Sequence, residues 1–364
     1  MKVAVLGVGL IGGSIGLAAR ARLDAEVAGF DPDGANLERG LEVGALDRSA
    51  GSVADAVSGA ELVFCAAPVR ALGPLVAAAL ASSDPEAAVT DVGSTKRELL
   101  AGMAEADGTE RFIGGHPLAG AETAGVQNAR ADLFEGARWY LTPTGNASGA
   151  HYDRVQRAIA ELGARPQAID AEAHDRMMAT VSHLPHVLAN VLVQEAAAAL
   201  AESSDRLPEV GPSFRDSARI AGANPAIWAD IFATNRDAVA GEIDAVVRRL
   251  AEAAELIRAG DPDAVGAWHA GALESRRALL ESELAGGPLC QLRVSVQDQP
   301  GAVAEIALAL GRQNVNIVDM ALYPAADARS GGMSLWIAGQ AEAERAAAVV
   351  GELGHAVAVL GGES

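Results

Sequence analysis

Two side chains that could move a proton follow neighbouring predicted strands in the first half of the chain. His116 lies on the polar, glycine-marked loop 114–122, and Ser94 lies in the segment 91–96. A histidine there can hydrogen-bond a substrate hydroxyl and take its proton as hydride leaves the same carbon. Ser94 could reach the same hydroxyl or orient the imidazole. The plainer alternatives are a surface or core histidine and a serine that only caps the next helix.

A nucleotide site is predicted by the glycines that directly follow the first apolar run. Gly7 would permit a tight turn, Gly9 would leave room for a pyrophosphate, and Gly12 would let helix and strand pack closely. The free N–H groups where the helix starts, at Leu10 and Ile11, would face the anion together with the helix dipole. A glycine-rich turn in some other α/β fold is the alternative.

The identity of the nucleotide is predicted by the residue that ends the second apolar run. That run, 26–30, stops at Asp31, about twenty residues past the glycines, where a carboxylate can accept hydrogen bonds from ribose hydroxyls. Asp33 adds negative charge where the 2′-phosphate of NADP would lie, and no arginine is adjacent. We therefore expect NAD to be the cofactor.

Three regions of different pattern follow one another along the chain. Apolar runs and helical segments alternate over residues 1–170, which predicts a Rossmann-type doubly wound α/β sheet with its ligands outside the carboxyl ends of the strands. Residues 171–286 are helical throughout, and residues 288–364 have the order β-α-β-β-α-β of a small ferredoxin-like module. The predicted fold is therefore a nucleotide-binding α/β domain, an all-α domain and a small α/β domain.

Composition excludes several classes of partner. The 364 residues are 50% hydrophobic and carry a formal net charge of −20, which argues against nucleic acid or an anionic membrane as partner. An anionic substrate must then be held by local cations. Cys65 and Cys290 lie in separate apolar runs and are expected to be buried free thiols. With neither a secretory signal nor a transmembrane stretch expected, a reducing cytoplasm is the predicted location.

The helical region contributes further candidate side chains. His183 and His186 lie three residues apart around Pro185, on one face of a helix that the proline should kink. Zinc ligation is disfavoured because no third ligand stands at suitable spacing, and polar contacts between helices are commoner. In so acidic a chain Arg219 is a candidate fork for a substrate carboxylate, although a surface salt bridge is the simpler interpretation.

Five of these segments together resemble the prephenate dehydrogenases and the related arogenate dehydrogenases of tyrosine biosynthesis, over residues 1–285. The segments are 7–12, 91–96, 115–122, 182–186 and 214–228, in that order. The C-terminal part, with Asp298-Gln299-Pro300-Gly301, resembles an ACT domain, a module that binds amino acids.

The resemblance implies an NAD-dependent oxidative decarboxylation that yields 4-hydroxyphenylpyruvate from prephenate. It implies that His116 deprotonates the ring hydroxyl with support from Ser94, and that Arg219 holds a substrate carboxylate. Further residues match positions that gate or line the substrate pocket: Glu122, His186, Arg215, Asp216 and Trp228. It also implies a homodimer formed by the helical domain and an amino-acid effector, tyrosine, bound by the ACT-like module.

Three alternatives stand beside this prediction. Arogenate could replace prephenate as substrate, a choice that one or two pocket residues, near 126–128 for instance, would decide. A β-hydroxyacid dehydrogenase would use a lysine of the helical domain, but no lysine follows Lys96. A non-catalytic amino-acid sensor is disfavoured because the glycines, His116 and Arg219 are all in place.

Overall fold

The computed structural model describes residues 1–104, 106–120, 123–201, 210–281, 289–297, 301–324 and 330–360. The chain forms two compact units, Met1–Arg248 and Arg249–Ser364, and each is described by itself.

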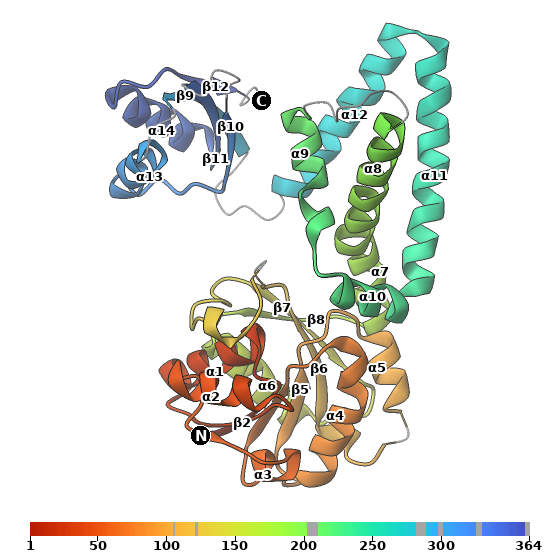
Figure 1. The fold of residues 1–364 in the computed structure, drawn as a ribbon, viewed down its shortest axis with the longest axis vertical. Coiled ribbons are helices and arrows are strands. Elements are labelled where there is room, and N and C mark those ends of the chain that lie inside the picture. Colours follow the sequence, from red (N-terminus) through yellow and green to blue (C-terminus); the bar gives the residue numbers. More distant parts are fainter. Residues whose placement is uncertain are drawn as a thin grey trace. The chain divides into compact units, whose positions relative to one another are not determined.

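An eight-stranded sheet forms the centre of the first unit (Figure 1). Its strands are β1 (Lys2–Leu6), β2 (Glu26–Phe30), β3 (Arg48–Ser49), β4 (Leu62–Cys65), β5 (Ala88–Asp91), β6 (Phe112–Pro117), β7 (Arg138–Pro143) and β8 (Arg165–Ala168). They lie in the order β3-β2-β1-β4-β5-β6-β7-β8, and only the β6–β7 pair is antiparallel. The first six strands have the order 3-2-1-4-5-6 of a dinucleotide-binding fold, so the predicted Rossmann-type sheet is confirmed.

Helices cover both faces of this sheet because successive strand residues point to opposite sides. Val3 and Val5 pack in one core with α1 and α6, whereas Ala4 and Leu6 pack in the other with α3, α4 and α5. The helices of this part are α1 (Leu10–Leu23), α2 (Gly34–Glu42), α3 (Val53–Val57), α4 (Val69–Ser82), α5 (Arg97–Gly102) and α6 (Gly149–Glu161). Short 3₁₀ turns occur at Thr109–Arg111 and Val126–Asn128. The arrangement is the doubly wound one that the alternating pattern predicts.

Helices alone follow the last strand of the first unit, as predicted. They are α7 (Ala171–Met178), α8 (Leu184–Ala201), α9 (Pro212–Ala218), α10 (Pro225–Thr234) and α11 (Arg236–Ala259), of which α11 runs on into the second unit. A π-helical turn, Ala179–His183, joins α7 to α8. Pro185 lacks the N–H that would bond the carbonyl of Val181, and the wider turn accommodates this loss.

The second unit contains α12 (Pro262–Glu281) and a small antiparallel sheet. The sheet is formed by β9 (Leu289–Gln297), β10 (Asp319–Pro324), β11 (Ser330–Ala338) and β12 (Val357–Leu360), with α13 (Ala302–Arg312) and α14 (Gln340–Glu352) packed on it. The strand order is β10-β11-β9-β12. Between α13 and β10 the Val315 N–H bonds the Leu310 carbonyl at the end of α13.

No helix in the described part of the chain has the length and apolar character needed to cross a membrane.

Candidate active site

The glycine loop has the shape that a bound pyrophosphate requires. Gly7 has φ +101°, and a Cβ there would lie 2.2 Å from the Ala66 carbonyl oxygen. A Cβ on Gly12 would lie 1.9 Å from the Gly7 carbonyl oxygen, so helix α1 can approach β1 only with glycine at that position. A Cβ on Gly9 would meet no atom within 4 Å. The space beside Gly9, next to the first N–H groups of α1, is therefore open to a ligand.

Asp31, at the end of β2, holds this loop in place. Its Oδ2 accepts the Val8 N–H at 2.7 Å, and its Oδ1 accepts the Asp33 N–H at 2.9 Å and the Asn36 amide at 3.2 Å. The carboxylate is half-buried, and lone pairs remain for the hydroxyls of a ribose. Asp33 is occupied as the N-cap of α2, accepting the Ala35 N–H at 3.0 Å. The loop and this acid fit NAD.

A buried ion pair fixes the neighbouring strand ends. Asp91, at the end of β5, accepts the N–H groups of Gly93 at 2.8 Å and Gly115 at 2.9 Å, and it is ion-paired with Lys96. The Lys96 amine also donates to the Gly115 carbonyl at 2.7 Å. Burial lowers the pKa of Lys96, and the facing Asp91 opposes that shift. Both residues lie in the segment 91–96, and the sequence alone indicated no role for either of them.

His116 lies inside β6 rather than on a loop after it. The antiparallel pairing of His116 with Tyr140 and of Pro117 with Trp139 extends the strand past Ile113, so the predicted loop position of His116 is wrong. The side chain is buried. Burial lowers the pKa of His116 well below its usual value, and the neighbouring His174 and Lys96 add to this effect. The ring is therefore neutral at physiological pH and can accept a proton.

His174 and Asp175 of α7 complete this cluster, and sequence reasoning missed both. His174 Nε2 lies 2.9 Å from His116 Nδ1, and His174 Nδ1 lies 2.8 Å from Asp175 Oδ1. His174 is fully buried, and Asp175 is 2% exposed. The sequence did offer one signal for them, which is an adjacent histidine and aspartate in the first helix after the sheet.

Ser94 does not cap the helix that follows it, so the capping alternative is wrong. Helix α5 begins at Arg97, and the carboxylate of Asp175 accepts the N–H groups of Lys96 at 2.8 Å and Arg97 at 2.9 Å instead. The Ser94 hydroxyl is half-buried and has no hydrogen-bond partner in the described part of the chain. It remains available to a ligand.

The helical part brings a second group of predicted residues together. The rings of His186 and Trp228 are stacked with centroids 3.5 Å apart, which joins α8 to α10. Burial lowers the pKa of His186, the Ile220 carbonyl opposes this shift, and the charge of nearby Arg219 reinforces it. Of the remaining predicted residues, Arg215 and Asp216 are exposed on α9, and Glu122 lies outside the described residues.

His183, on the π-helical turn, lies between these two groups. Its Nδ1 is 3.2 Å from the Asn235 amide, which also donates to the Asp175 carbonyl at 2.8 Å. Burial lowers the pKa of His183 to about 4, although Asp175 favours the charged form. His183 is therefore a neutral hydrogen-bond acceptor in the structure.

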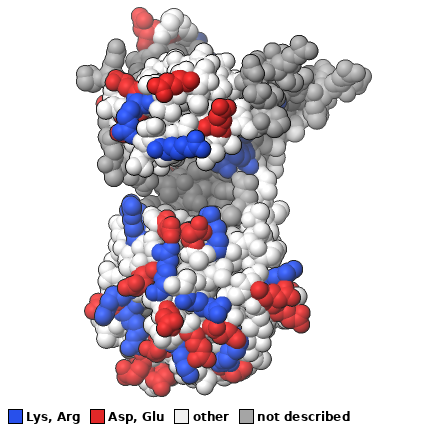
Figure 2. All heavy atoms as spheres, turned by 90° about the vertical axis from the view of Figure 1, so that its left-hand side faces the viewer, with Lys and Arg blue, Asp and Glu red and all other residues white. Residues whose placement is uncertain are grey.

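Acidic and basic side chains are interspersed on the face of the molecule shown in Figure 2. With a net charge of −20, the general field repels anions. A substrate carboxylate therefore needs a specific cation, and Arg219 is an exposed arginine beside His186.

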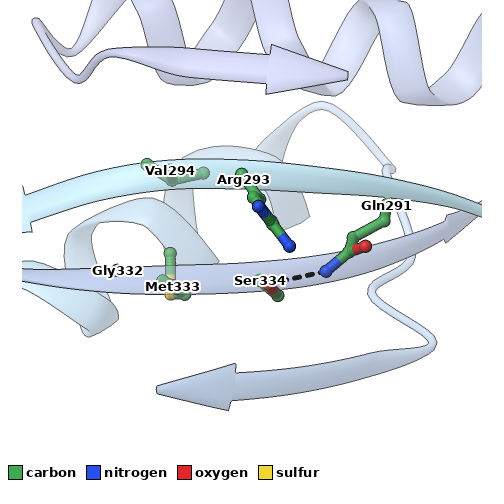
Figure 3. A pocket seen from close by; sticks show the side chains of 6 residues that line it. All are labelled: Gln291, Arg293, Val294, Gly332, Met333 and Ser334. Atoms are coloured by element: carbon green, nitrogen blue, oxygen red, sulfur yellow. Dashed lines mark hydrogen bonds between the residues drawn. The ribbon is translucent and has the colours of Figure 1, made fainter. Parts of the chain in front are cut away.

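The second unit has a hollow of its own, of about 300 Å³, on its sheet (Figure 3). Residues of β9 and β11 line it: Gln291, Arg293, Val294, Gly332, Met333 and Ser334. The Gln291 amide donates to the Ser334 hydroxyl at 2.8 Å, and Arg293 is exposed beside this pair. The hollow can offer a positive charge and an amide to a small polar ligand.

Comparison with known proteins agrees with this geometry. Residues 15–167 match the family described as prephenate dehydrogenase, nucleotide-binding domain, and residues 170–269 match prephenate dehydrogenase, dimerization domain. The prephenate dehydrogenase of Bacillus subtilis (strain 168) is 30% identical over 330 residues, 88% of this chain and 88% of that protein.

Two solved structures are similar over most of the chain. One is the prephenate dehydrogenase from A. aeolicus in complex with hydroxyphenyl propionate and NAD+, with a TM-score of 0.72 and 28% identity over 77% of this chain and 98% of that chain. The other is the Synechocystis arogenate dehydrogenase, with a TM-score of 0.66 and 25% identity over 77% of this chain and 100% of that chain. With its nucleotide-binding sheet, its helical domain and a relative of this identity and coverage, the chain belongs to the prephenate dehydrogenase family.

Proposed function

We propose that the protein catalyses the NAD-dependent oxidative decarboxylation of prephenate to 4-hydroxyphenylpyruvate in tyrosine biosynthesis. The observation that carries the proposal is a buried, neutral His116 at the carboxyl edge of a sheet whose first strand ends in an open glycine loop. When bound, NAD accepts the hydride. The protein must then remove the hydroxyl proton, and His116 is placed for this step.

Each predicted site residue has a proposed role. The free Ser94 hydroxyl supports the hydrogen bond between His116 and the substrate, and Arg219 holds a substrate carboxylate. The pocket is lined or gated by His186, Trp228, Arg215, Asp216 and Glu122. NAD is held by Gly7, Gly9, Leu10, Ile11, Gly12, Asp31 and Ser94. No metal takes part in this proposal.

Initial-rate nicotinamide reduction tests the proposal directly. Prephenate and arogenate are offered in turn, each with NAD and with NADP. Turnover of prephenate with NAD is the expected result, and turnover of arogenate alone would establish the arogenate dehydrogenase instead. Absence of turnover in all four mixtures, with NAD binding confirmed, would refute both and favour an amino-acid sensor.

Substitution of His116 tests the assigned role. His116→Asn should lower kcat by about 10²–10⁴ while the far-UV circular dichroism stays unchanged, because a general base is lost. A near-normal kcat would remove His116 from the mechanism.

A homodimer joined through the helical part, residues 171–286, is also proposed. Apolar side chains are exposed on the π-helical turn and α8: Val181, Leu188, Val191 and Leu192. Such a stripe on one helix surface is typical of a subunit interface. Val191→Glu should give a monomer in analytical ultracentrifugation, and a dimer unchanged in stability would refute this interface.

The C-terminal part, residues 288–364, is proposed to be an ACT-like, ferredoxin-like module that binds tyrosine as a feedback inhibitor. Its strand order and the hollow beside Arg293 support a ligand-binding role. Loss of tyrosine inhibition after removal of 288–364 is expected, whereas full inhibition would indicate competition at the active site of the 1–170 and 171–286 domains. Cys65 and Cys290 are buried and form no disulfide with each other, which suits the cytoplasmic location that we propose.

A further inference from the structure

His116, His174 and Asp175 are joined by two consecutive side-chain hydrogen bonds. The two histidine nitrogens are 2.9 Å apart, and the carboxylate oxygen lies 2.8 Å from the far nitrogen of His174. His174 is fully buried, and the Tyr140 ring lies edge-on to it with centroids 5.7 Å apart. Burial and ring packing hold the imidazole of His174 in one orientation.

The proton positions in these two hydrogen bonds can be assigned by starting from the Asp175 carboxylate. Asp175 Oδ1 accepts the Lys96 N–H, and Oδ2 accepts the Arg97 N–H. A carboxylate held by two backbone donors acts as an acceptor, so the proton in its contact with His174 belongs to His174 Nδ1.

The assignment then passes along both rings. A neutral His174 that carries its proton on Nδ1 has a bare Nε2, which must accept the proton on His116 Nδ1. A neutral His116 with its proton on Nδ1 has a bare Nε2. That nitrogen has no partner in the described part of the chain.

We propose that His174 and Asp175 are positioning residues that fix His116 in the Nδ1–H tautomer and so keep its Nε2 free to take the substrate proton. In the proton-transfer step, the substrate O–H bond breaks and an N–H bond forms at His116 Nε2. Hydride leaves the carbon that bears this hydroxyl for the nicotinamide. The positive charge gained by His116 is then stabilised through His174 by the Asp175 carboxylate. The inference rests on the proposed function only for what the free Nε2 does; the tautomer itself is inferred from the hydrogen bonds.

The neighbouring charged groups define the competing arrangement. His174 lies beside His116 of β6, Asp175 of its own helix and His183 of the π-helical turn. Lys96, before α5, acts on His116. If His174 were the imidazolium, it would donate to His116 Nδ1 and place the His116 proton on Nε2. His116 would then be a donor to the substrate and not an acceptor.

Nitrogen-15 NMR of the full-length protein with labelled histidine distinguishes these arrangements without any turnover. The seven histidines give few signals, and loss of one pair in His116→Gln assigns His116. The expected result is a neutral His116 with a protonated Nδ1 and a bare Nε2. A protonated Nε2 would overturn the inference, whether or not the enzyme turns over prephenate.

Two variants of His174 test the consequence for catalysis. His174→Phe removes the acceptor for the His116 proton and should lower kcat by about 10² or more, with the KM for NAD unchanged; in the serine protease triad the acid that fixes the histidine tautomer contributes about 10⁴. His174→Gln places an amide oxygen near the former Nε2, so its kcat should exceed that of His174→Phe at least tenfold. Equal losses in both variants, or no loss in either, would refute the positioning role. Failure of the wild type to oxidise any substrate would refute the proposed function and leave the NMR test to decide the tautomer.

Discussion

Lys96 should be the more costly of the two lysines to remove, because it neutralises a carboxylate that water does not reach. The Lys96 and Asp91 side chains are both 0% exposed. Removing one partner of a buried ion pair costs about 3–5 kcal/mol, since the other charge is left buried. Asp91 would still accept the N–H groups of Gly93 and Gly115, which places the expected loss at the lower end. We expect Lys96→Met to lower the free energy of unfolding by about 3 kcal/mol.

Urea unfolding followed by tryptophan fluorescence measures this loss. Trp139 is fully buried in β7, in the same sheet as Asp91, and reports on its unfolding. The other lysine of the chain supplies a matched control. Lys2 lies 3.9 Å from Glu26 with both side chains more than half exposed, so Lys2→Met should change the free energy of unfolding by less than about 1 kcal/mol.

A double-mutant cycle separates the ion pair from other effects of the substitution. Asp91→Asn removes the negative charge but keeps an oxygen for a backbone N–H. The double variant Asp91→Asn/Lys96→Met should therefore be destabilised by at least about 1 kcal/mol less than the sum of the two single variants. A loss below 1 kcal/mol in Lys96→Met, or simple additivity in the cycle, would refute the reasoning.

Three further predictions concern the cofactor loop, the substrate cation and acid stability. Gly9→Ala should fold like the wild type, because a Cβ there meets no atom within 4 Å, yet it should weaken NAD binding about tenfold or more in isothermal titration. As the control, Gly51→Ala is equally unhindered and should bind NAD normally. Arg219→Ala should reduce kcat/KM for prephenate by about 2–4 kcal/mol of transition-state stabilisation, and an unchanged kcat/KM would exclude this carboxylate contact. The pKa of His183 is about 4 in the folded protein, so between pH 6.5 and 4 the unfolded chain binds a proton there that the folded protein does not. Urea titrations should therefore show the free energy of unfolding falling by about 2–3 kcal/mol as the pH drops from 6.5 to 4. His183→Asn should flatten that fall; an unchanged pH dependence would contradict it.

Sequence reasoning succeeded where the relevant interactions are local. The turn at Gly7, the close packing at Gly12 and the position of Asp31 depend on neighbouring residues in one β-α-β unit, and the structure has each of them as predicted. The apolar periodicity also separated the sheet region from the helical one.

It failed where the partners are distant in sequence. The His116–His174 contact spans 58 residues, and the Lys96–Asp175 contact spans 79. Ser94 has the residue type and position of an N-cap, but a carboxylate from α7 takes that place. The two-residue strand β3 is too short to give a pattern. Local propensity does not reveal which distant acid competes for a helix terminus.

The polar contacts around Asp175 join helix α7 to the start of α5 and to the end of α10. Its carboxylate binds the start of α5 and orients His174, while its carbonyl accepts the Asn235 amide at the end of α10. The Thr95 and Thr234 hydroxyls, 2.9 Å apart, add a second buried link between the same elements. Apolar packing tolerates small shifts, whereas buried hydrogen bonds have strict geometry and are costly to leave unmade. These hydrogen bonds therefore hold the start of α5, the His174 ring and the end of α10 in fixed positions relative to one another.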